Sequence, residues 1–174
     1  SSQRHLPNTR RKTYPNHMEA YQKQLLGHAM WVLVVGLVCG FMLAISLIGG
    51  LELVPGVFVN VPMFGTTDGW VRAHAGGISN CLLMVAMAFA LPHCGLAMAR
   101  AQVFAKGIIF AGWSNTIFYW TGNASGSRAL SFSDNALGSS NVLGVIGYTL
   151  AVVAAVVTLY IAAQMGRGFL KKSA

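Results

Sequence analysis

The sequence predicts an all-α integral membrane protein in which four transmembrane helices form a compact bundle. The chain has 174 residues, of which 55% are hydrophobic and only 9% are charged. A soluble domain of this size needs more charge to cover its surface, so we expect lipid to surround much of the chain. The apolar residues also fall into four runs, each close to the ~20 residues that cross the hydrocarbon core of a membrane.

Residues 1–23 are polar and form the predicted N-terminal tail. The first span follows at residues 25–48. It carries Gly36 and Gly40 at the GxxxG spacing, which allows the backbone of another helix to approach closely. We therefore expect this face of the first span to be a helix–helix contact.

The predicted membrane domain covers residues 24–167. Its three further spans lie at residues 70–96, 103–121 and 142–165. Residues 51–69 contain two prolines and three glycines and are predicted to form an outer loop, with re-entry into the membrane as the alternative. A second loop, 122–141, is rich in serine, glycine and asparagine, and residues 168–174 form a basic tail.

The net charge of +8 alone is compatible with nucleic-acid binding, but the positions of the charges indicate a membrane protein instead. Four spans place both termini on one side, together with the connection between the second and third spans. The basic residues on that side are Arg4, Arg10, Arg11, Lys12, Lys23, Arg100, Lys106, Arg167, Lys171 and Lys172. Only Arg72 and Arg128 lie on the other side, so the positive-inside rule predicts two cytoplasmic termini and no nucleic-acid partner.

Polar side chains inside a membrane are costly, which makes them candidates for function. His74 lies near the outer end of the second span, and Asn80 follows six residues later, at ~9 Å of helical rise and a rotation of about 120°. Asn115 and Tyr119 of the third span are four residues apart and share one helix face. All four residues can therefore meet at a similar depth.

The role of His74 has two interpretations at this point. A neutral imidazole is a good ligand for iron, whereas a histidine near the membrane surface can simply bond to a backbone carbonyl. His28 and His93, which lie towards the cytoplasmic side, are the alternative haem or metal ligands, unless both reach the interface.

Four segments in series resemble the styrene oxide isomerase family. They are GGLELVPG at 49–56, GWVRAHAG at 69–76, GWSN at 112–115 and SRALSF at 127–132. The position of Asn80 relative to the second segment also matches the family, and Phe118 and Tyr119 follow the third segment as they do in the family. The resemblance covers about residues 25–167. The chain departs from the family in its longer N-terminal tail and at Ala111, where the family carries an aspartate.

The resemblance implies a four-helix protein of the bacterial inner membrane that assembles as a homotrimer, with ferric haem b bound between subunits. It implies an isomerase that converts styrene oxide and related small aromatic epoxides to aryl acetaldehydes by the Meinwald rearrangement. His74 corresponds to the axial ligand of the haem iron, and Asn80, Asn115 and Tyr119 to the polar catalytic residues. The ferric haem acts as the Lewis acid, a 1,2-hydride shift follows, and Asn80 or Tyr119 donates a hydrogen bond to the oxygen.

Two other functions remain open from the sequence. A membrane haem b protein for electron transfer is the main alternative, although that role favours two axial ligands and the outer half of the spans offers His74 alone. A transporter or assembly factor without a cofactor is the second. Trp113, Phe118 and Trp120 either line an aromatic substrate pocket or serve in packing.

Overall fold

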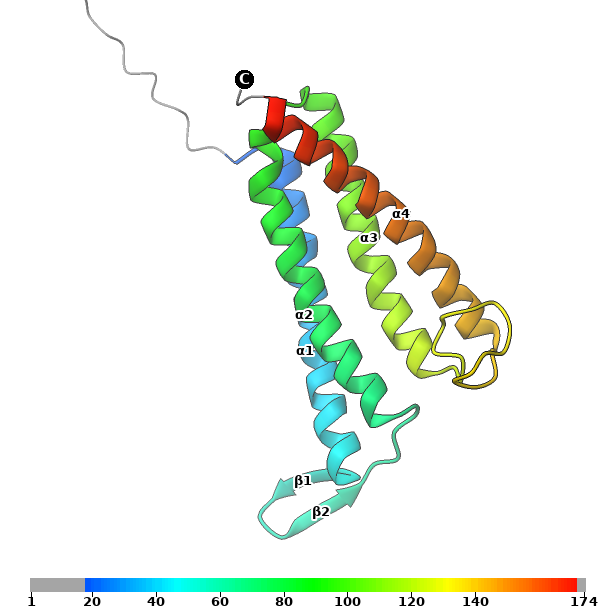
Figure 1. Cartoon of the computed structure of the whole chain (residues 1–174). Coiled ribbons are helices and arrows are strands. Elements are labelled where there is room, and N and C mark those ends of the chain that lie inside the picture. The colour runs from blue at the N-terminus through cyan, green and yellow to red at the C-terminus, as the bar shows by residue number, and fades with distance from the viewer. Residues whose placement is uncertain (1–17, 172–174) are drawn as a thin grey trace, which may run out of the picture.

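The computed structural model describes residues 18–171, which are mostly helical. Four long helices follow one another along the chain (Figure 1): α1 (Ala20–Ile48), α2 (Thr67–Ala90), α3 (Met98–Asn123) and α4 (Val142–Lys171). A short 3-10 helix, η1 (Leu91–Cys94), continues α2. The predicted tails lie mainly outside the described residues, at 1–17 and 172–174.

Helix α1 begins earlier than the predicted end of the polar tail at residue 23. The Gln22 side chain accepts a hydrogen bond from the Glu19 N–H (3.0 Å), which satisfies a donor at the start of the helix. The same side chain donates to the Ala88 carbonyl at the end of α2 (3.0 Å). Because the Gln22 side chain is hydrogen-bonded within the protein, this polar residue can belong to the first turn of α1.

The segment between α1 and α2 corrects the prediction of an all-α chain. Strands β1 (Gly50–Val54) and β2 (Val57–Asn60) form an antiparallel hairpin where we expected a loop. Gly56 has a φ of 82°, which glycine adopts without strain, and its N–H donates to Glu52 Oε1 (2.9 Å). A Pro-Gly pair between two short apolar runs, the second rich in valine, is a hairpin signal that our interpretation as a loop missed.

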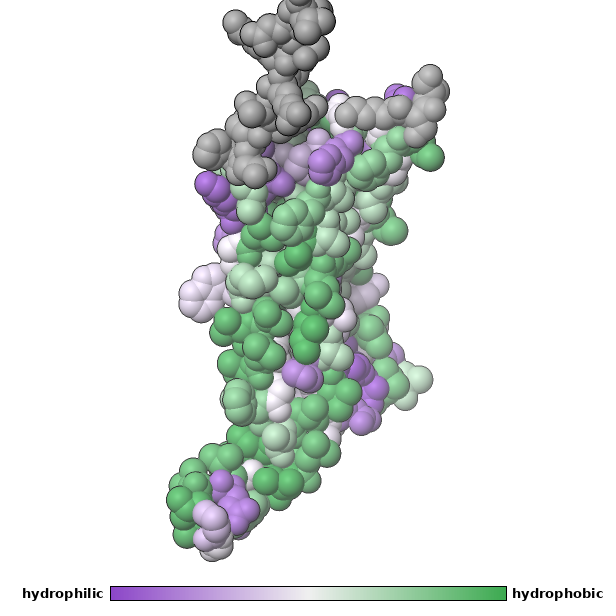
Figure 2. Space-filling model, turned by 90° about the vertical axis from the view of Figure 1, so that its left-hand side faces the viewer, coloured by the Kyte–Doolittle hydropathy of each residue, from purple (hydrophilic) through white to green (hydrophobic). Residues whose placement is uncertain are grey.

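Three helices are long and apolar enough to cross a membrane: α1, α2 with η1 (Thr67–Cys94), and α4. Figure 2 shows the face formed by α1 and α2, which is largely apolar along the helices. Hydrophilic residues lie at the top of this view, with smaller groups at the lower right and at the bottom tip. Helix α3, which contains the predicted span 103–121, is not among the three because it carries more polar residues. Several of these are buried against neighbours, namely Ser114, Thr116 and Asn123.

The helices pack as two pairs joined through α3. Helix α1 packs along α2, and α4 packs along α3, while α3 also contacts α2 and α1 (Figure 1). The backbones of α1 and α2 touch where they cross, since a Cβ placed on Gly77 would lie 2.6 Å from Gly36 Cα. This confirms the helix contact predicted from the glycine spacing.

Two regions of the molecule are used below as reference points. The hairpin end is the end of the helices next to β1 and β2, and the terminal end is where α1 begins and α4 ends (Figure 1). The main apolar core lies towards the terminal end, around Leu25, Met84 and Phe104. A smaller cluster around Cys39 and the fully buried Trp70 lies nearer the hairpin end.

Candidate functional site

The contact between α2 and α3 forms a seam that carries three of the four predicted polar residues. Tyr119 lies with its ring against Gly76, where a Cβ would have no room. One turn further along both helices, Asn115 Nδ2 donates to Asn80 Oδ1 at 3.4 Å. These pairs follow from the i, i+4 spacing on each helix, which places Gly76 and Asn80 on one face and Asn115 and Tyr119 on the facing one.

Asn80 is the most distinctive group in this seam. Its side chain is 7% exposed, and its Nδ2 atom is buried without a hydrogen-bond partner among residues 18–171. An unpaired buried donor is unfavourable, and more so in a membrane, where no water is at hand to replace the lost bond. The Asn80 amide is therefore a donor that awaits an acceptor.

A small cavity adjoins Asn80, with a volume of about 10 Å³. Residues of α2 and α3 form most of its lining, among them Ala111, Gly112 and Asn115 of α3. Thr158 contributes from α4. This is about the room that one water-sized oxygen atom needs. The apolar body of a ligand would have to lie outside the cavity while its oxygen enters.

His74 lies on a different face of α2, turned towards α1. Its Nδ1 atom lies 2.9 Å from the Gly36 carbonyl oxygen. The ring fits there because Gly40 has no side chain: a Cβ on Gly40 would come within 2.9 Å of the imidazole. Since a carbonyl oxygen only accepts, Nδ1 must carry the proton, and in the neutral ring Nε2 keeps its lone pair.

Both interpretations of His74 are compatible with this geometry. The bond to the Gly36 carbonyl is the one expected for a structural histidine near the membrane surface. It is also the bond that metal-ligating histidines make with their second nitrogen, which fixes the tautomer and the ring orientation. No hydrogen bond among the described residues uses Nε2. Within one chain, however, His74 does not join Asn80, Asn115 and Tyr119.

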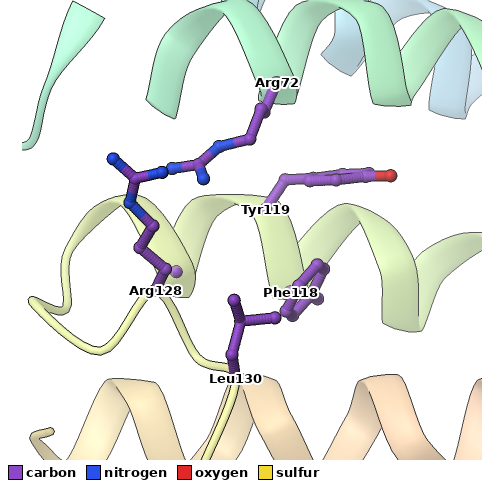
Figure 3. Close-up of a pocket in the computed structure, with 6 residues that line it drawn as sticks. Arg72, Phe118, Tyr119, Arg128 and Leu130 are labelled. Carbon is purple, nitrogen blue, oxygen red and sulfur yellow. The ribbon is translucent and has the colours of Figure 1, made fainter. Parts of the chain in front are cut away.

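A cavity of about 220 Å³ lies beside Tyr119 at the hairpin end of the seam (Figure 3). Two arginines, Arg72 from α2 and Arg128 from the loop after α3, lie at one end of it, and the Tyr119 hydroxyl points away from them. Phe118 and Leu130 complete its apolar wall. Sequence reasoning counted both arginines only as charges, although they were the two basic residues placed away from the cytoplasmic side.

Residues 18–171 contain two further histidines, His28 and His93. The indole N–H of Trp113 donates to His28 Nδ1 (3.1 Å), which uses the lone pair of that nitrogen and ties α3 to α1. His93 is exposed in η1. Residues 18–171 contain no group of three or more histidine, cysteine, aspartate or glutamate side chains that could hold a metal ion. A single histidine suits a macrocycle, which brings its own nitrogen ligands.

The predicted aromatic lining is present only in part. Phe118 faces the larger cavity beside Tyr119. Trp120 instead packs edge-on against Trp70, with ring centroids 5.3 Å apart, and Trp113 is engaged by His28. The two tryptophans therefore act in packing within this chain.

Comparisons with known proteins show which family this chain belongs to. The sequence profile of the family described as styrene oxide isomerase matches residues 21–170, which cover all four helices except the terminal residues Ala20 and Lys171. A curated relative, the styrene-oxide isomerase of Pseudomonas fluorescens, is 30% identical over 154 residues, covering 88% of this chain and 91% of the relative. A match of this extent spans the seam, His74 and both cavities, and the chain belongs to the styrene oxide isomerase family.

Proposed function

We propose that this chain isomerises styrene oxide and related aryl epoxides to aryl acetaldehydes by the Meinwald rearrangement. Family membership supports the reaction class. The observation that carries the proposal is the unpaired amide donor of Asn80 beside a cavity that admits one oxygen atom. A donor placed where negative charge develops stabilises the transition state more than the bound epoxide.

The reaction needs little acid or base from the protein. The benzylic C–O bond breaks, a hydride moves from the terminal carbon to the benzylic carbon, and the terminal carbon becomes the aldehyde. All atoms and electrons stay within the substrate. The two cavities of the seam, within residues 18–171, are lined by no acidic side chain, as this chemistry allows. Asn80 and Tyr119 then serve as neutral donors to the oxygen.

We further propose that His74 holds haem b through Nε2. The observation that fits is its Nδ1–H bond to the Gly36 carbonyl, which leaves Nε2 as the ligating atom. Ferric haem would supply a Lewis acid that polarises the epoxide oxygen. Gly40 supports this role indirectly, because a side chain at that position would push the imidazole out of its place.

We also propose a homotrimer with the haem between subunits, and the separation of these groups supports a site shared between protomers. His74 faces α1, while Asn80, Asn115 and Tyr119 face the α2–α3 seam. A flat macrocycle bound to His74 is difficult to reach from the seam of the same chain. The seam of a neighbouring protomer can supply the donors instead, so we expect an isolated protomer to be inactive.

The proposed location is the bacterial inner membrane, with both termini in the cytoplasm. The described ends of α1 and α4 lie together at the terminal end (Figure 1). Of the seven basic residues within 18–171, that end carries five, namely Lys23, Arg100, Lys106, Arg167 and Lys171. Lipid-facing helices and apolar cavities would also exclude water, which protects the developing cation from hydrolysis to a diol.

The direct test uses detergent-purified protein and styrene oxide. We expect a Soret band from bound haem and phenylacetaldehyde as the product, without any added electron donor. His28→Ala is the matched control, because it removes a histidine of α1 whose Nδ1 is already bonded to Trp113 and which we do not assign to the haem. His74→Ala, in contrast, should remove both the Soret band and the product. Diol as the main product, or no turnover by haem-loaded protein, would contradict the proposal.

Reduction separates the isomerase from the electron-transfer alternative. Ferrous iron is the weaker Lewis acid, so dithionite under nitrogen should stop turnover and reoxidation should restore it. A loss of about 4 kcal/mol of transition-state stabilisation corresponds to about a thousand-fold slower turnover. Equal rates in both oxidation states would leave the haem a structural role and move the chemistry to a side chain such as Tyr119.

A further inference from the structure

Two arginines that are far apart in sequence meet at the hairpin end of the seam. Arg72 comes from the second turn of α2, and Arg128 from the loop that follows α3. Their guanidinium groups lie next to each other at one end of the cavity of about 220 Å³ (Figure 3). Like charges this close repel each other, so an anion between them would relieve an unfavourable contact.

The backbone of the loop is built to hold Arg128 there. Arg128 and Ala129 have φ values of 57° and 54°, a left-handed conformation that is strained for residues other than glycine. Surrounding bonds maintain it: Ser127 N donates to Ser139 O (2.9 Å), and Asn135 Nδ2 donates to Ser127 O (3.0 Å). Ala129 is fully buried. The strain therefore positions a charged side chain at the cavity.

The chain itself offers these two cations little compensation. Of its four acidic residues, Glu52 is engaged by Gly56 N–H, Asp134 by Ser140 N–H, and Glu19 lies at the terminal end. Asp68, one helical turn before Arg72, is the remaining one. One carboxylate beside two guanidinium groups leaves an excess positive charge at the cavity.

The rest of the cavity describes the ligand. Phe118, Leu130 and the ring of Tyr119 form an apolar wall next to the arginines. The site thus suits an anionic group attached to a large apolar body. The two carboxylates of haem b have this chemistry, and the phosphate of an anionic lipid shares it. Tyr119 belongs both to this cavity and to the α2–α3 seam. We therefore favour haem b over a lipid, because haem b is the ligand that we propose to act at the seam.

We infer that Arg72 and Arg128 bind the carboxylates of the haem and thereby orient it against the Tyr119 face of the seam. This assignment rests on the proposed function, because it requires that haem b is the cofactor. Arginine matches a carboxylate with two parallel hydrogen bonds, so lysine should replace it only in part.

The test compares haem with its dimethyl ester, which keeps the iron and macrocycle but lacks both charges. Each ligand is titrated into haem-free purified protein, and the Soret band reports binding. We expect the unmodified protein to bind haem at least about ten- to a hundred-fold more tightly than the ester, because this is the range for losing a single charged hydrogen-bonded contact and the ester lacks two. Arg72→Gln/Arg128→Gln should lose this preference and keep the ester affinity.

Two controls make the result specific. Arg100→Gln/Arg167→Gln removes two arginines at the terminal end and should retain the full preference. Arg72→Lys/Arg128→Lys keeps the charge and should retain part of it, which also covers the case in which the glutamine variant does not fold, as judged by circular dichroism.

The outcomes separate the two proposals and the two anions. Equal affinity of the unmodified protein for haem and ester would overturn the arginine assignment while leaving haem binding intact. Absence of Soret binding by either ligand would overturn the proposed function itself. Nanodiscs test the lipid: loss of the preference when phosphatidylglycerol replaces part of a zwitterionic lipid would assign the arginines to lipid phosphate instead.

Discussion

Replacing Asn80 with leucine should uncouple stability from activity. Asn80→Leu removes the buried Nδ2 donor that has no partner among the described residues, and leucine has nearly the same shape. Removing an unsatisfied buried group gains about 1–3 kcal/mol. The change also leaves Asn115 Nδ2 without its acceptor. This costs only about 0.5 kcal/mol, because the bond is long at 3.4 Å and Asn115 is only partly buried. The free energy of unfolding should therefore rise by about 0.5–2.5 kcal/mol.

Activity should change in the opposite direction. Loss of one donor to the developing oxyanion lowers turnover by about ten- to a thousand-fold. Thermal unfolding of the detergent-purified variant and its rate of phenylacetaldehyde formation measure the two effects on one sample. We expect a higher midpoint and a lower rate, with an unchanged Soret band because His74 lies on another face of α2.

Asn115→Leu is the matched comparison, since it removes the partner and keeps the unpaired donor. Both polar ends of the Asn80 side chain are then unsatisfied, and we expect the unfolding midpoint to fall. A midpoint for Asn80→Leu that falls as far as that of Asn115→Leu would refute the reasoning. It would mean that the Asn80 amide has a partner in the assembled protein and is not held ready for substrate.

Three further changes test other parts of the site. His74→Ala should lose the Soret band and the activity while the helical circular dichroism stays, and retained stoichiometric haem would identify a different axial ligand. Tyr119→Phe should keep the haem and lower turnover by about ten- to a thousand-fold, whereas an unchanged rate would assign Tyr119 to packing. Gly77→Ala should destabilise the protein by about 1–3 kcal/mol, because its Cβ would lie 2.6 Å from the Gly36 backbone. Gly27→Ala is the control, since a Cβ there meets nothing within 4 Å. Equal thermal midpoints for the two variants would contradict this prediction.

Much of the helix arrangement and of the seam could be predicted from local patterns. Apolar runs indicate membrane helices because lipid requires an apolar surface over a fixed length. Asn115 and Tyr119 share a face because they are four residues apart, and the helix repeat is constant. The hairpin was missed although Pro55 and Gly56 indicate a turn, because a loop and a hairpin both contain such pairs.

The sequence by itself determined which residues are polar in an apolar setting and how they are spaced along each helix. Only the tertiary structure decided which neighbour each of them meets. The rotation of α2 against its partners turns His74 to Gly36 and Asn80 to Asn115, and it brings Arg72 to Arg128 across 56 residues. These contacts depend on helix crossings set by glycine backbones and by a strained loop, and neither is encoded by the period of one helix.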